Sequence, residues 1–297
     1  MDSPAEAYAP FWVGKEFGEF EKENIDLKIE KVPAAQFVQA GLTGQADVVL
    51  PGGGGLFNAV SSGANLRMVA SAYDTDSSTG FYLSPKLAAE IPNFGPCDMK
   101  GRSVAVAPGG TIASASAVPI SEYLAECDLT LKDVELSGQV GADSVVALQT
   151  GALDVAMEYV NLGAQAEQMG AKQIIPFPKD YQFAPWVFGP KLLEDPSAAA
   201  AVLRAMVRTV RTHLQGDYHT DPEVMAVLSQ YEGLPDDTIA SFPLLQFNPN
   251  LAMNADNLVT SLQQVWFDYG GVLSYNEPLK TDQVADFSIL EKVVSTG

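Results

Sequence analysis

The stretch that most constrains the fold of this chain is residues 99–111, which read MKGRSVAVAPGGT. Val104 and Val106 alternate with small residues, as in a short β-strand, and the Pro-Gly-Gly that follows ends the strand and permits a sharp turn. We therefore predict a strand, a glycine turn and a helix that begins near Thr111. The first N–H groups of such a helix lack partners and lie at the positive end of its dipole, so they favour an anionic group. An ordinary βα turn without a ligand is the alternative.

A second glycine-rich turn occurs earlier in the chain. Residues 46–50 predict a buried strand, and the PGGGG of residues 51–55 leaves no side chains between the backbone and a neighbour. Pro119 falls within the helix expected after residue 111 and should kink or split it. Apolar patterns predict further strands at 25–32, 66–72, 80–83, 174–177 and 182–188, and helices at 34–42, 56–62, 143–149, 199–214, 222–230 and 255–269. Strands that alternate with helices predict an α/β fold.

One six-residue pattern occurs twice. Thr-Gly-x-x-Asp-Val stands at residues 43–48 and again at residues 150–155, which is 107 positions later (150 minus 43). Both copies fall where a predicted helix gives way to a strand. The repeat suggests two lobes of similar construction, although a pattern this short can also arise by coincidence.

Composition limits the classes of partner. The chain has 297 residues, of which 47% are hydrophobic and 18% charged, so it is a folded protein long enough to form two lobes. Its net charge of -20 argues against binding to nucleic acid or to anionic membrane surfaces. No apolar run is long enough to cross a bilayer, and the first residues lack the pattern of a signal peptide. We expect either a cytosolic protein or one whose leader has been removed.

Residues typical of catalytic and metal sites are scarce. Cys97 and Cys127 have no metal-site spacing, and we interpret both as buried thiols. His213 and His219 lie in the late helical region, far from either cysteine in sequence, and we interpret them as residues of a solvated helix face. The glycine turns lack the lysine of a phosphate loop. We therefore predict no catalytic residues, no metal and no cofactor.

A ligand site is expected where the strands of such sheets end. In open α/β sheets, ligands bind beyond the carboxyl ends of the strands, which here are residues 51–55, 73–75, 108–111 and 158–161. Aromatic side chains near these ends could stack on a flat organic ligand, or could simply be core residues. They are Phe11, Trp12, Tyr73, Tyr159 and Trp186.

Charge near the strand ends narrows the ligand chemistry. Asp74, Asp76 and Glu158 are acidic, whereas no Arg or Lys stands directly beside the glycine turns. An anion would therefore depend on backbone N–H groups and on nearby hydroxyl groups. A ligand that carries an amine or a ring N–H could donate to Glu158, unless that residue is a solvated loop residue or a contact between lobes. The hydroxyl groups are those of Thr75, Thr111 and Ser114.

Four segments carry a resemblance to a known family. They are YAPFWVGKEFGEFEKENIDL at 8–27, LFNAVSSGANL at 56–66, MKGRSVAV at 99–106 and LQTGALDVAME at 148–158. In order and spacing they resemble the periplasmic solute-binding proteins of ABC importers, in the sulfonate, taurine, nitrate and thiamine-pyrimidine (NMT1/SsuA-like) group. Each motif is loose alone, but together they are specific and extend over nearly the whole chain.

The resemblance implies an α/β, type II periplasmic-binding-protein fold, in which two lobes are joined by two crossover strands and close over a ligand in the hinge cleft. It places lobe 1 at residues 1–80 and 184–297, including the C-terminal helices, and lobe 2 at residues 85–178. The crossings are expected near residues 79–84 and 178–188.

The resemblance also implies the ligand-binding positions. One departure from the family is Tyr159, because the acidic residue at position 158 is often followed by proline in the family. The implied ligand-binding residues are Phe11, Trp12, Gly53, Gly54, Tyr73, Asp74, Gly110, Thr111, Glu158, Tyr159 and Trp186.

The implied function is capture of a small organic solute for import by an ABC transporter. The solute would be a sulfonate, an aromatic or other organic acid, or a pyrimidine-like molecule, and it would stabilise the closed state through contacts made only there. The expected partners are this small-molecule ligand and the transporter permease, with no nucleic acid, and the expected state is a monomer. The location would be periplasmic or otherwise extracytoplasmic, with membrane association if a lipoprotein leader was removed. The alternatives are a pyrimidine-synthase-like enzyme of the same fold, which would need a histidine in the cleft, and a ligand-sensing receptor domain.

Overall fold

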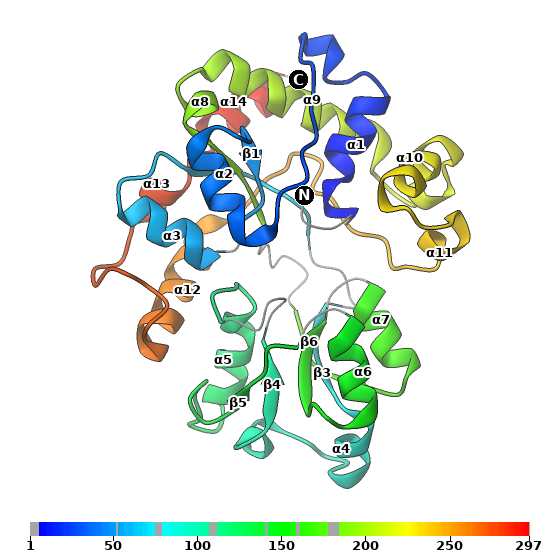
Figure 1. Ribbon diagram of the computed structural model, residues 1–297, viewed down its shortest axis with the longest axis vertical. Helices are drawn as coiled ribbons and strands as arrows, with labels where there is room; N and C mark the ends of the chain where they lie inside the picture. Colours follow the sequence, from blue (N-terminus) through cyan, green and yellow to red (C-terminus); the bar gives the residue numbers. More distant parts are fainter. Residues whose placement is uncertain are drawn as a thin grey trace. The chain divides into compact units, whose positions relative to one another are not determined.

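The computed structural model describes residues 6–51, 53–74, 79–106, 112–139, 142–158, 161–177 and 184–296. Contacts divide the chain into two compact units, whose elements can be followed by label and colour in Figure 1. Unit 1 comprises Met1–Asp74, Ala184–Asn257 and Glu277–Gly297, and unit 2 comprises Thr75–Phe183 and Leu258–Asn276.

Unit 1 contains a three-stranded antiparallel sheet in the order β1-β8-β2. The strands are β1 (Val48–Val49), β8 (Pro185–Phe188) and β2 (Arg67–Ser71). All four side chains of β8 are buried, as expected for the middle strand of an apolar sheet. In the described residues, the strands predicted at 46–50, 66–72 and 182–188 are confirmed.

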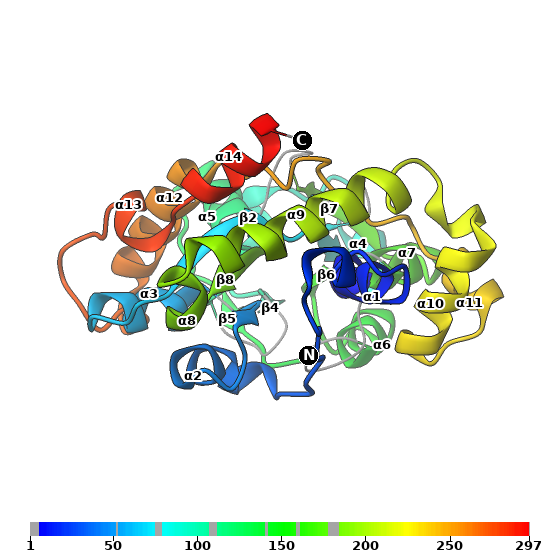
Figure 2. The same cartoon turned by 90° about the horizontal axis from the view of Figure 1, so that it is seen from above.

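Helices surround this sheet, and α9 is the longest of those described. Asp195 begins α9 by accepting hydrogen bonds from the N–H groups of Ser197 and Ala198, and Pro196 occupies the first turn, where no intrahelical N–H bond is lost. Helix α14 lies along α9, which Figures 1 and 2 both show. The helices of unit 1 are α1 (Ala9–Glu16), α2 (Phe37–Thr43), α3 (Gly53–Ser61), α8 (Pro190–Leu193), α9 (Pro196–His213), α10 (Pro222–Glu232), α11 (Asp236–Ala240), α13 (Thr281–Val284) and α14 (Ser288–Thr296), with short 3-10 turns η1 (Glu6–Tyr8), η2 (Glu21–Glu23), η3 (Ala34–Gln36) and η5 (Tyr218–Thr220).

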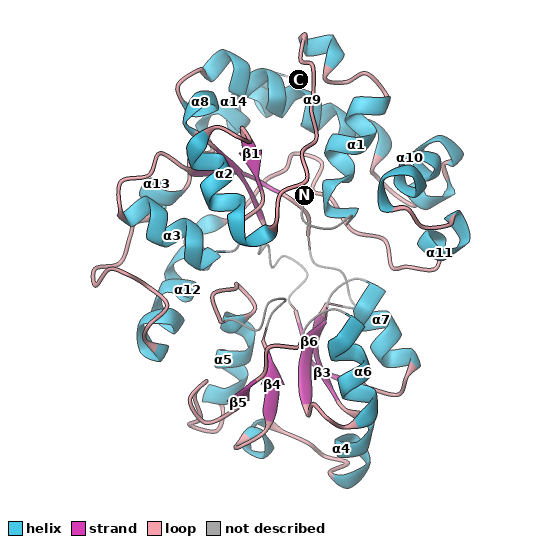
Figure 3. Cartoon of the chain, in the orientation of Figure 1, coloured by secondary structure: helices cyan, strands magenta, loops and turns pink. Residues whose placement is uncertain are grey.

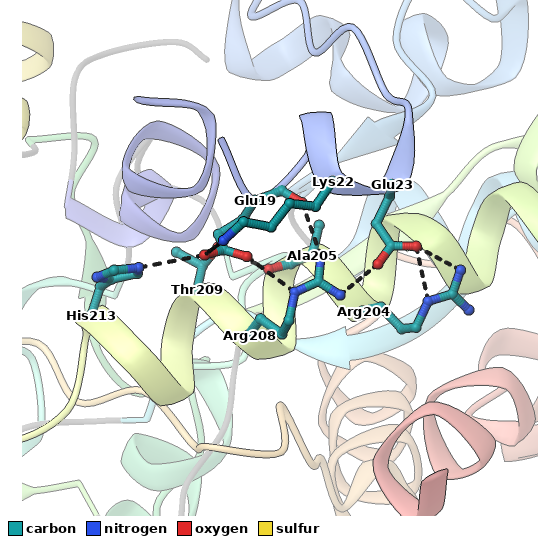
Figure 4. Close-up of polar contacts among 8 residues, drawn as sticks. All are labelled: Glu19, Lys22, Glu23, Arg204, Ala205, Arg208, Thr209 and His213. Carbon is teal, nitrogen blue, oxygen red and sulfur yellow. Dashed lines mark hydrogen bonds and ion pairs between the residues drawn. The ribbon is translucent and has the colours of Figure 1, made fainter. Parts of the chain in front are cut away.

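A network of ion pairs joins residues 19–23, which include η2, to α9 (Figure 4). Arg208 Nε lies 3.0 Å from a carboxylate oxygen of Glu19, and Arg204 Nη2 lies 2.7 Å from one of Glu23. Arg208 also contacts Glu23, and Lys22 contacts Glu19, so each carboxylate has two basic partners. Burial opposes ionisation of Glu19, but the hydrogen bonds from Lys22 and Arg208 outweigh it and lower its pKa. Hydrogen bonds from Arg204 and then Arg208 lower the pKa of Glu23.

We expect Arg208→Gln to lower the free energy of unfolding of unit 1 by about 1 to 2 kcal/mol near neutral pH, because a shared partner of two little-exposed carboxylates is lost. The lowered pKa values mean that this contribution is present above the ordinary carboxyl pKa and disappears as the pH falls through the folded-state values. Urea unfolding at several pH values measures both effects. Lys191→Gln is the control, since its pair with Asp47 is solvent-exposed, at 75% and 41%, and should be worth under about 0.5 kcal/mol. Equal losses for the two variants would contradict a special role of the network.

Unit 2 contains a five-stranded mixed sheet in the order β5-β4-β6-β3-β7. Strand β4 pairs in parallel with β5 and β6, whereas β3 pairs antiparallel with β6 and β7. Figure 3 shows α5 to one side of β4, and α6 and α7 to the other side of β6. The strands are β3 (Gly80–Leu83), β4 (Ser103–Ala105), β5 (Glu135–Leu136), β6 (Val155–Glu158) and β7 (Lys172–Pro176), and the helices are α4 (Pro85–Glu90), α5 (Ala117–Ala125), α6 (Ala142–Thr150) and α7 (Asn161–Gln168), with the 3-10 turn η4 (Pro96–Met99).

Helix α12 (Ala255–Tyr269) begins at the end of a unit 1 segment and continues in unit 2. Trp266 donates from its indole N–H to the carbonyl oxygen of Ile112 at 2.6 Å, and Lys132 Nζ donates to the carbonyl oxygen of Asp268 at 2.8 Å. The division into units, together with these contacts, places residues 258–276 with unit 2, whereas the family resemblance implies lobe 1 for residues 184–297. Apolar spacing shows that α12 buries one face but does not show which core receives it.

Three predicted elements differ from the structure. Residues 25–32 contain no described strand, although the exposure of their side chains alternates as a strand would require. Helix α3 begins at Gly53 rather than residue 56, so three glycines occupy its first turn. Helix α5 begins at Ala117 rather than near Thr111, and Pro119 lies in its first turn, where its missing N–H costs no helical bond and causes no split.

The interpretation of the two cysteines as buried thiols is wrong. Cys97 and Cys127 form a disulfide with a Cα–Cα distance of 5.2 Å, and Cys97 is exposed. The bond joins η4 to the turn that follows α5. Two cysteines 30 residues apart carry no pairing signal in sequence, because pairing depends on how the chain between them folds back.

The repeated Thr-Gly-x-x-Asp-Val pattern marks equivalent turns in the two units. Thr43 ends α2 and Thr150 ends α6, and the glycine that follows each is left-handed, with φ of 70° at Gly44 and 71° at Gly151. A strand then begins at the valine of each pattern, β1 in unit 1 and β6 in unit 2. The repeat therefore reflects a shared helix-to-strand construction.

The strands that pair with β1 and β6 also correspond. Val48 of β1 lies opposite Phe188 of β8, and Val155 of β6 lies opposite Leu83 of β3. Phe188 is followed by Gly-Pro-Lys-Leu and Leu83 by Ser-Pro-Lys-Leu, and each of these sequences leads into a helix, α8 or α4. Strands β1 and β8 of unit 1 are thus the counterparts of β6 and β3 of unit 2.

Candidate functional site

Glu158 is the predicted site residue with the most unusual environment. It ends β6, lies opposite Gly80 in the sheet and is 1% exposed. Ser144, in the first turn of α6, donates a hydrogen bond to Glu158 Oε1 at 2.6 Å. Gly80 is required beside it, because a Cβ there would lie 2.4 Å from the carbonyl oxygen of Ile175. The sheet thus holds a carboxyl group, with one hydroxyl donor, in the interior of unit 2.

Burial changes the chemistry of this carboxyl group. Removal from water raises the pKa of Glu158 to about 7, and the hydrogen bond from Ser144 only partly opposes that rise. The side chain therefore changes between a neutral group that can donate a hydrogen bond and a carboxylate that can only accept, close to neutral pH. Sequence reasoning did not identify Ser144. The only signal for it was its position in the first turn of the helix that precedes the strand ending in Glu158.

The carboxyl ends of β4 and β6 lie at the same edge of the unit 2 sheet, because these neighbouring strands run parallel. Beyond β4, Ser116 Oγ donates to the carbonyl oxygen of Val106 at 2.5 Å and lies 2.9 Å from the hydroxyl of Ser114, which ties the turn before α5 to the strand. The predicted site residues Gly110, Thr111 and Tyr159 lie outside the described residues.

Three predicted aromatic residues lie together in unit 1. Phe11 and Trp12 come from α1, and Trp186 comes from the middle strand β8; their exposures are 8%, 0% and 2%. The rings of Phe11 and Trp186 meet edge to face at 4.8 Å, and Trp12 stacks on Tyr231 at 5.3 Å. These geometries are those of packed core aromatics.

The same aromatic residues line a cavity inside unit 1, which we call the unit 1 cavity. Its volume is ≈ 550 Å³, and β1 and residues 25–30 form two of its walls. The other predicted unit 1 residues are elsewhere: Gly53 and Gly54 lie in the first turn of α3, and Asp74 N–H donates to the carbonyl oxygen of Gln246 at 2.8 Å. Tyr73 precedes Asp74 and is half-buried.

In the described chain, the cysteine and histidine side chains already have partners, and side chains that could bind a metal do not cluster. The two cysteines are joined, and His213 lies 3.7 Å from Glu19. His219 is not on a solvated helix face as predicted, since it lies buried in η5, 3.1 Å from Glu6. Among the residues the structure describes, no three His, Cys, Asp or Glu side chains gather as metal ligands. Within the same residues, no helix has the length and apolar character needed to cross a membrane.

A family comparison identifies the chain's relatives. The profile of the family described as "NMT1/THI5 like" matches residues 6–213, which is more than half of the chain. The chain belongs to this family. The match includes β1 to β8 and the whole Glu158 region, so family membership covers both units.

Solved structures confirm the fold of this NMT1/THI5-like protein. The periplasmic aliphatic sulphonate binding protein SsuA from Escherichia coli is 18% identical, with 93% of this chain and 88% of that chain covered and a TM-score of 0.68. The periplasmic nitrate-binding protein NrtA from Synechocystis PCC 6803 is 15% identical, with 98% and 86% covered and a TM-score of 0.71. The expected α/β periplasmic-binding-protein fold is therefore confirmed.

An enzyme has the same fold. The desulfurization enzyme DszB is 15% identical, with 97% of this chain and 96% of that chain covered and a TM-score of 0.63. No curated protein gives a significant sequence match. The fold therefore serves both solute binding and catalysis, and the choice between them depends on site chemistry.

Proposed function

We propose that this protein is the solute-binding component of an ABC importer and binds a small organic solute without transforming it. The solute is a sulfonate, an aromatic or other organic acid, or a pyrimidine-like molecule. The observation that carries the proposal is Glu158, a buried carboxyl at the end of a sheet strand in a member of a family whose fold is shared with sulfonate- and nitrate-binding proteins. Tyr73 and Asp74 of unit 1, which are half-buried, are the further contacts that we propose.

Two observations support binding rather than catalysis. The paired cysteines supply no thiol nucleophile, and each histidine lies against a glutamate, His213 against Glu19 and His219 against Glu6. A disulfide persists in oxidising compartments, which supports an extracytoplasmic location. Such a location suits delivery of solute to a transporter permease, the partner that we propose.

The affinity for a solute should change with pH as Glu158 ionises, and the sign of the change should depend on the charge of the solute. An anionic solute should bind about tenfold more tightly below pH 7, where Glu158 is neutral and can donate, than above it. A solute that presents an amine or ring N–H should show the opposite preference. Titration calorimetry with an alkanesulfonate, an aromatic carboxylate, nitrate and an aminopyrimidine, at about pH 6 and pH 8, tests this expectation.

Glu158→Gln should remove the pH preference, and Glu232→Gln is the matched control. Glu232 lies in unit 1 and also has a pKa raised to about 7, chiefly by burial, but it is not a predicted contact. Loss of the pH preference in both variants would exclude Glu158 as the contact. Conversion of any solute to product would contradict a purely binding role.

A further inference from the structure

The basic side chains of unit 2 are distributed unevenly along its sheet. Strands β4, β5, β6 and β7 begin at the edge where β3 ends, because Leu83 lies opposite both Val155 and Lys172 and the other pairs run parallel. The described Lys and Arg residues of unit 2 follow β3, precede β4 or β5, or begin β7. They are Lys86, Lys100, Arg102, Lys132 and Lys172, while Lys179 lies outside the described residues. Glu158, at the end of β6, stands at the opposite edge.

The elements packed against β6 contain acidic but no basic residues. These elements are β3, β4, α6 and α7, and their sequences include no Lys, Arg or His. Their titratable groups are Tyr82 on β3, which is buried, and Asp143 on α6 and Glu167 on α7, which are exposed. Burial raises the pKa of Glu158 and Ser144 opposes the rise, and no charged group of the described chain contributes. The carboxyl group therefore lies in surroundings without a cation.

The first turns of α5 and α6 make hydrogen bonds within the protein. Ser144, in the first turn of α6, donates its hydroxyl to Glu158, so the positive end of this helix faces a carboxyl group of the chain itself. At the start of α5, the N–H groups of Ala117 and Val118 donate to carbonyl oxygens three residues earlier, both at 3.1 Å. These donors are therefore already used and do not await an anionic solute.

The charge of Glu158 decides which solutes are favoured beside it. Its side chain is 1% exposed, and an ionised carboxylate so poorly hydrated repels an anion and attracts a cation more strongly than one in water does. A protonated nitrogen group would supply both the opposite charge and N–H donors, which a carboxylate accepts in short, charge-assisted hydrogen bonds. Asp74, the charged residue among the predicted contacts of unit 1, is acidic as well.

We propose that the solute bound at Glu158 is an organic cation whose protonated nitrogen group donates N–H hydrogen bonds to the carboxylate. This inference rests on the proposed function and excludes its anionic solutes. Binding then moves one proton, because a protonated Glu158 that receives the cation releases its proton to the solvent while the solute keeps its own charge. The pKa of Glu158 is raised to about 7, so this release is largest below neutral pH.

Benzamidine and benzoate test the proposal, since they are nearly equal in size and opposite in charge. At about pH 8, titration calorimetry of the parent protein should show an affinity at least about tenfold higher for benzamidine than for benzoate. At about pH 6, titrations in two buffers of different ionisation enthalpy should show release of about one proton per benzamidine bound. Glu158→Gln should abolish both the preference and the proton release. Glu167→Gln, which alters an exposed carboxylate on α7, is the control and should retain both.

The comparison of the two probes uses the parent protein, so it decides the proposal even if Glu158→Gln fails to fold. An affinity for benzoate that equals or exceeds that for benzamidine, including no measurable binding of either, overturns the proposal. Benzamidine binding that keeps its affinity and proton release in Glu158→Gln overturns it as well. A tightly bound sulfonate or nitrate would overturn the cation and leave the solute-binding function standing. Conversion of benzamidine to a product would contradict that function and not the charge of the solute.

Discussion

Reduction of the Cys97–Cys127 disulfide is expected to lower the free energy of unfolding of unit 2 by about 3 to 4 kcal/mol, because it releases a loop of 30 residues in the unfolded chain. The loop includes β4 and all of α5, so the bond restricts the elements that build the carboxyl edge of this sheet. Urea unfolding with and without dithiothreitol, followed by a probe in unit 2, measures the effect.

The matched control is the double variant Cys97→Ser and Cys127→Ser. With or without dithiothreitol, unit 2 of this variant should unfold at the same urea concentration as unit 2 of the reduced parent protein. Unit 1, whose segments contain no cysteine, should keep its own midpoint. An unchanged unit 2 midpoint, with mass spectrometry showing complete reduction, would contradict a stabilising role for this bond.

The stability of unit 2 is expected to fall by about 3 kcal/mol as the pH rises from 4.5 to above 7, because of Glu158. Burial raises its pKa to about 7, so between these pH values the folded state holds a proton that the unfolded state has released. The state with more bound protons loses stability as the pH rises. Glu158→Gln should remove this slope and should be more stable than the parent at pH 8.

Glu232 provides the comparison within the same molecule. Its pKa is also raised to about 7, first by burial and then by Glu6, while His219 opposes the rise. Its Oε1 is buried and has no hydrogen-bond partner among the described residues. Glu232→Gln should therefore reduce the pH slope of unit 1 and leave that of unit 2 unchanged. If Glu158→Gln leaves the slope of unit 2 intact, the carboxyl group is solvated in the folded state.

Much of the local structure follows from short patterns. The apolar runs at 66–72 and 80–83 predict β2 and β3, and the Thr-Gly-x-x-Asp-Val repeat predicts two helix-to-strand turns, because each signal depends on residues a few positions apart. The family resemblance rests on similar short motifs. The expectation of a ligand at Glu158 came from its place at a strand end, and it stays a prediction.

Other features depend on residues that are distant in sequence. Alternation at residues 25–32 predicts a strand, but a strand needs a neighbour to pair with, and the described chain leaves a cavity there. The predicted start of α3 is too late because glycine is tolerated in its first turn. The predicted start of α5 is too early because the helix was expected directly after the glycine turn, and Pro119 lies in its first turn without splitting it.

By itself the sequence determined most of the helical and extended segments, which faces are apolar, and the family to which the chain belongs, since these follow from residue type and short-range spacing. Only the tertiary structure decided that Cys97 meets Cys127, that α12 packs with unit 2, and that Ser144 reaches Glu158. These distances depend on how the elements pack together. The same packing excludes water from Glu158 and so raises its pKa.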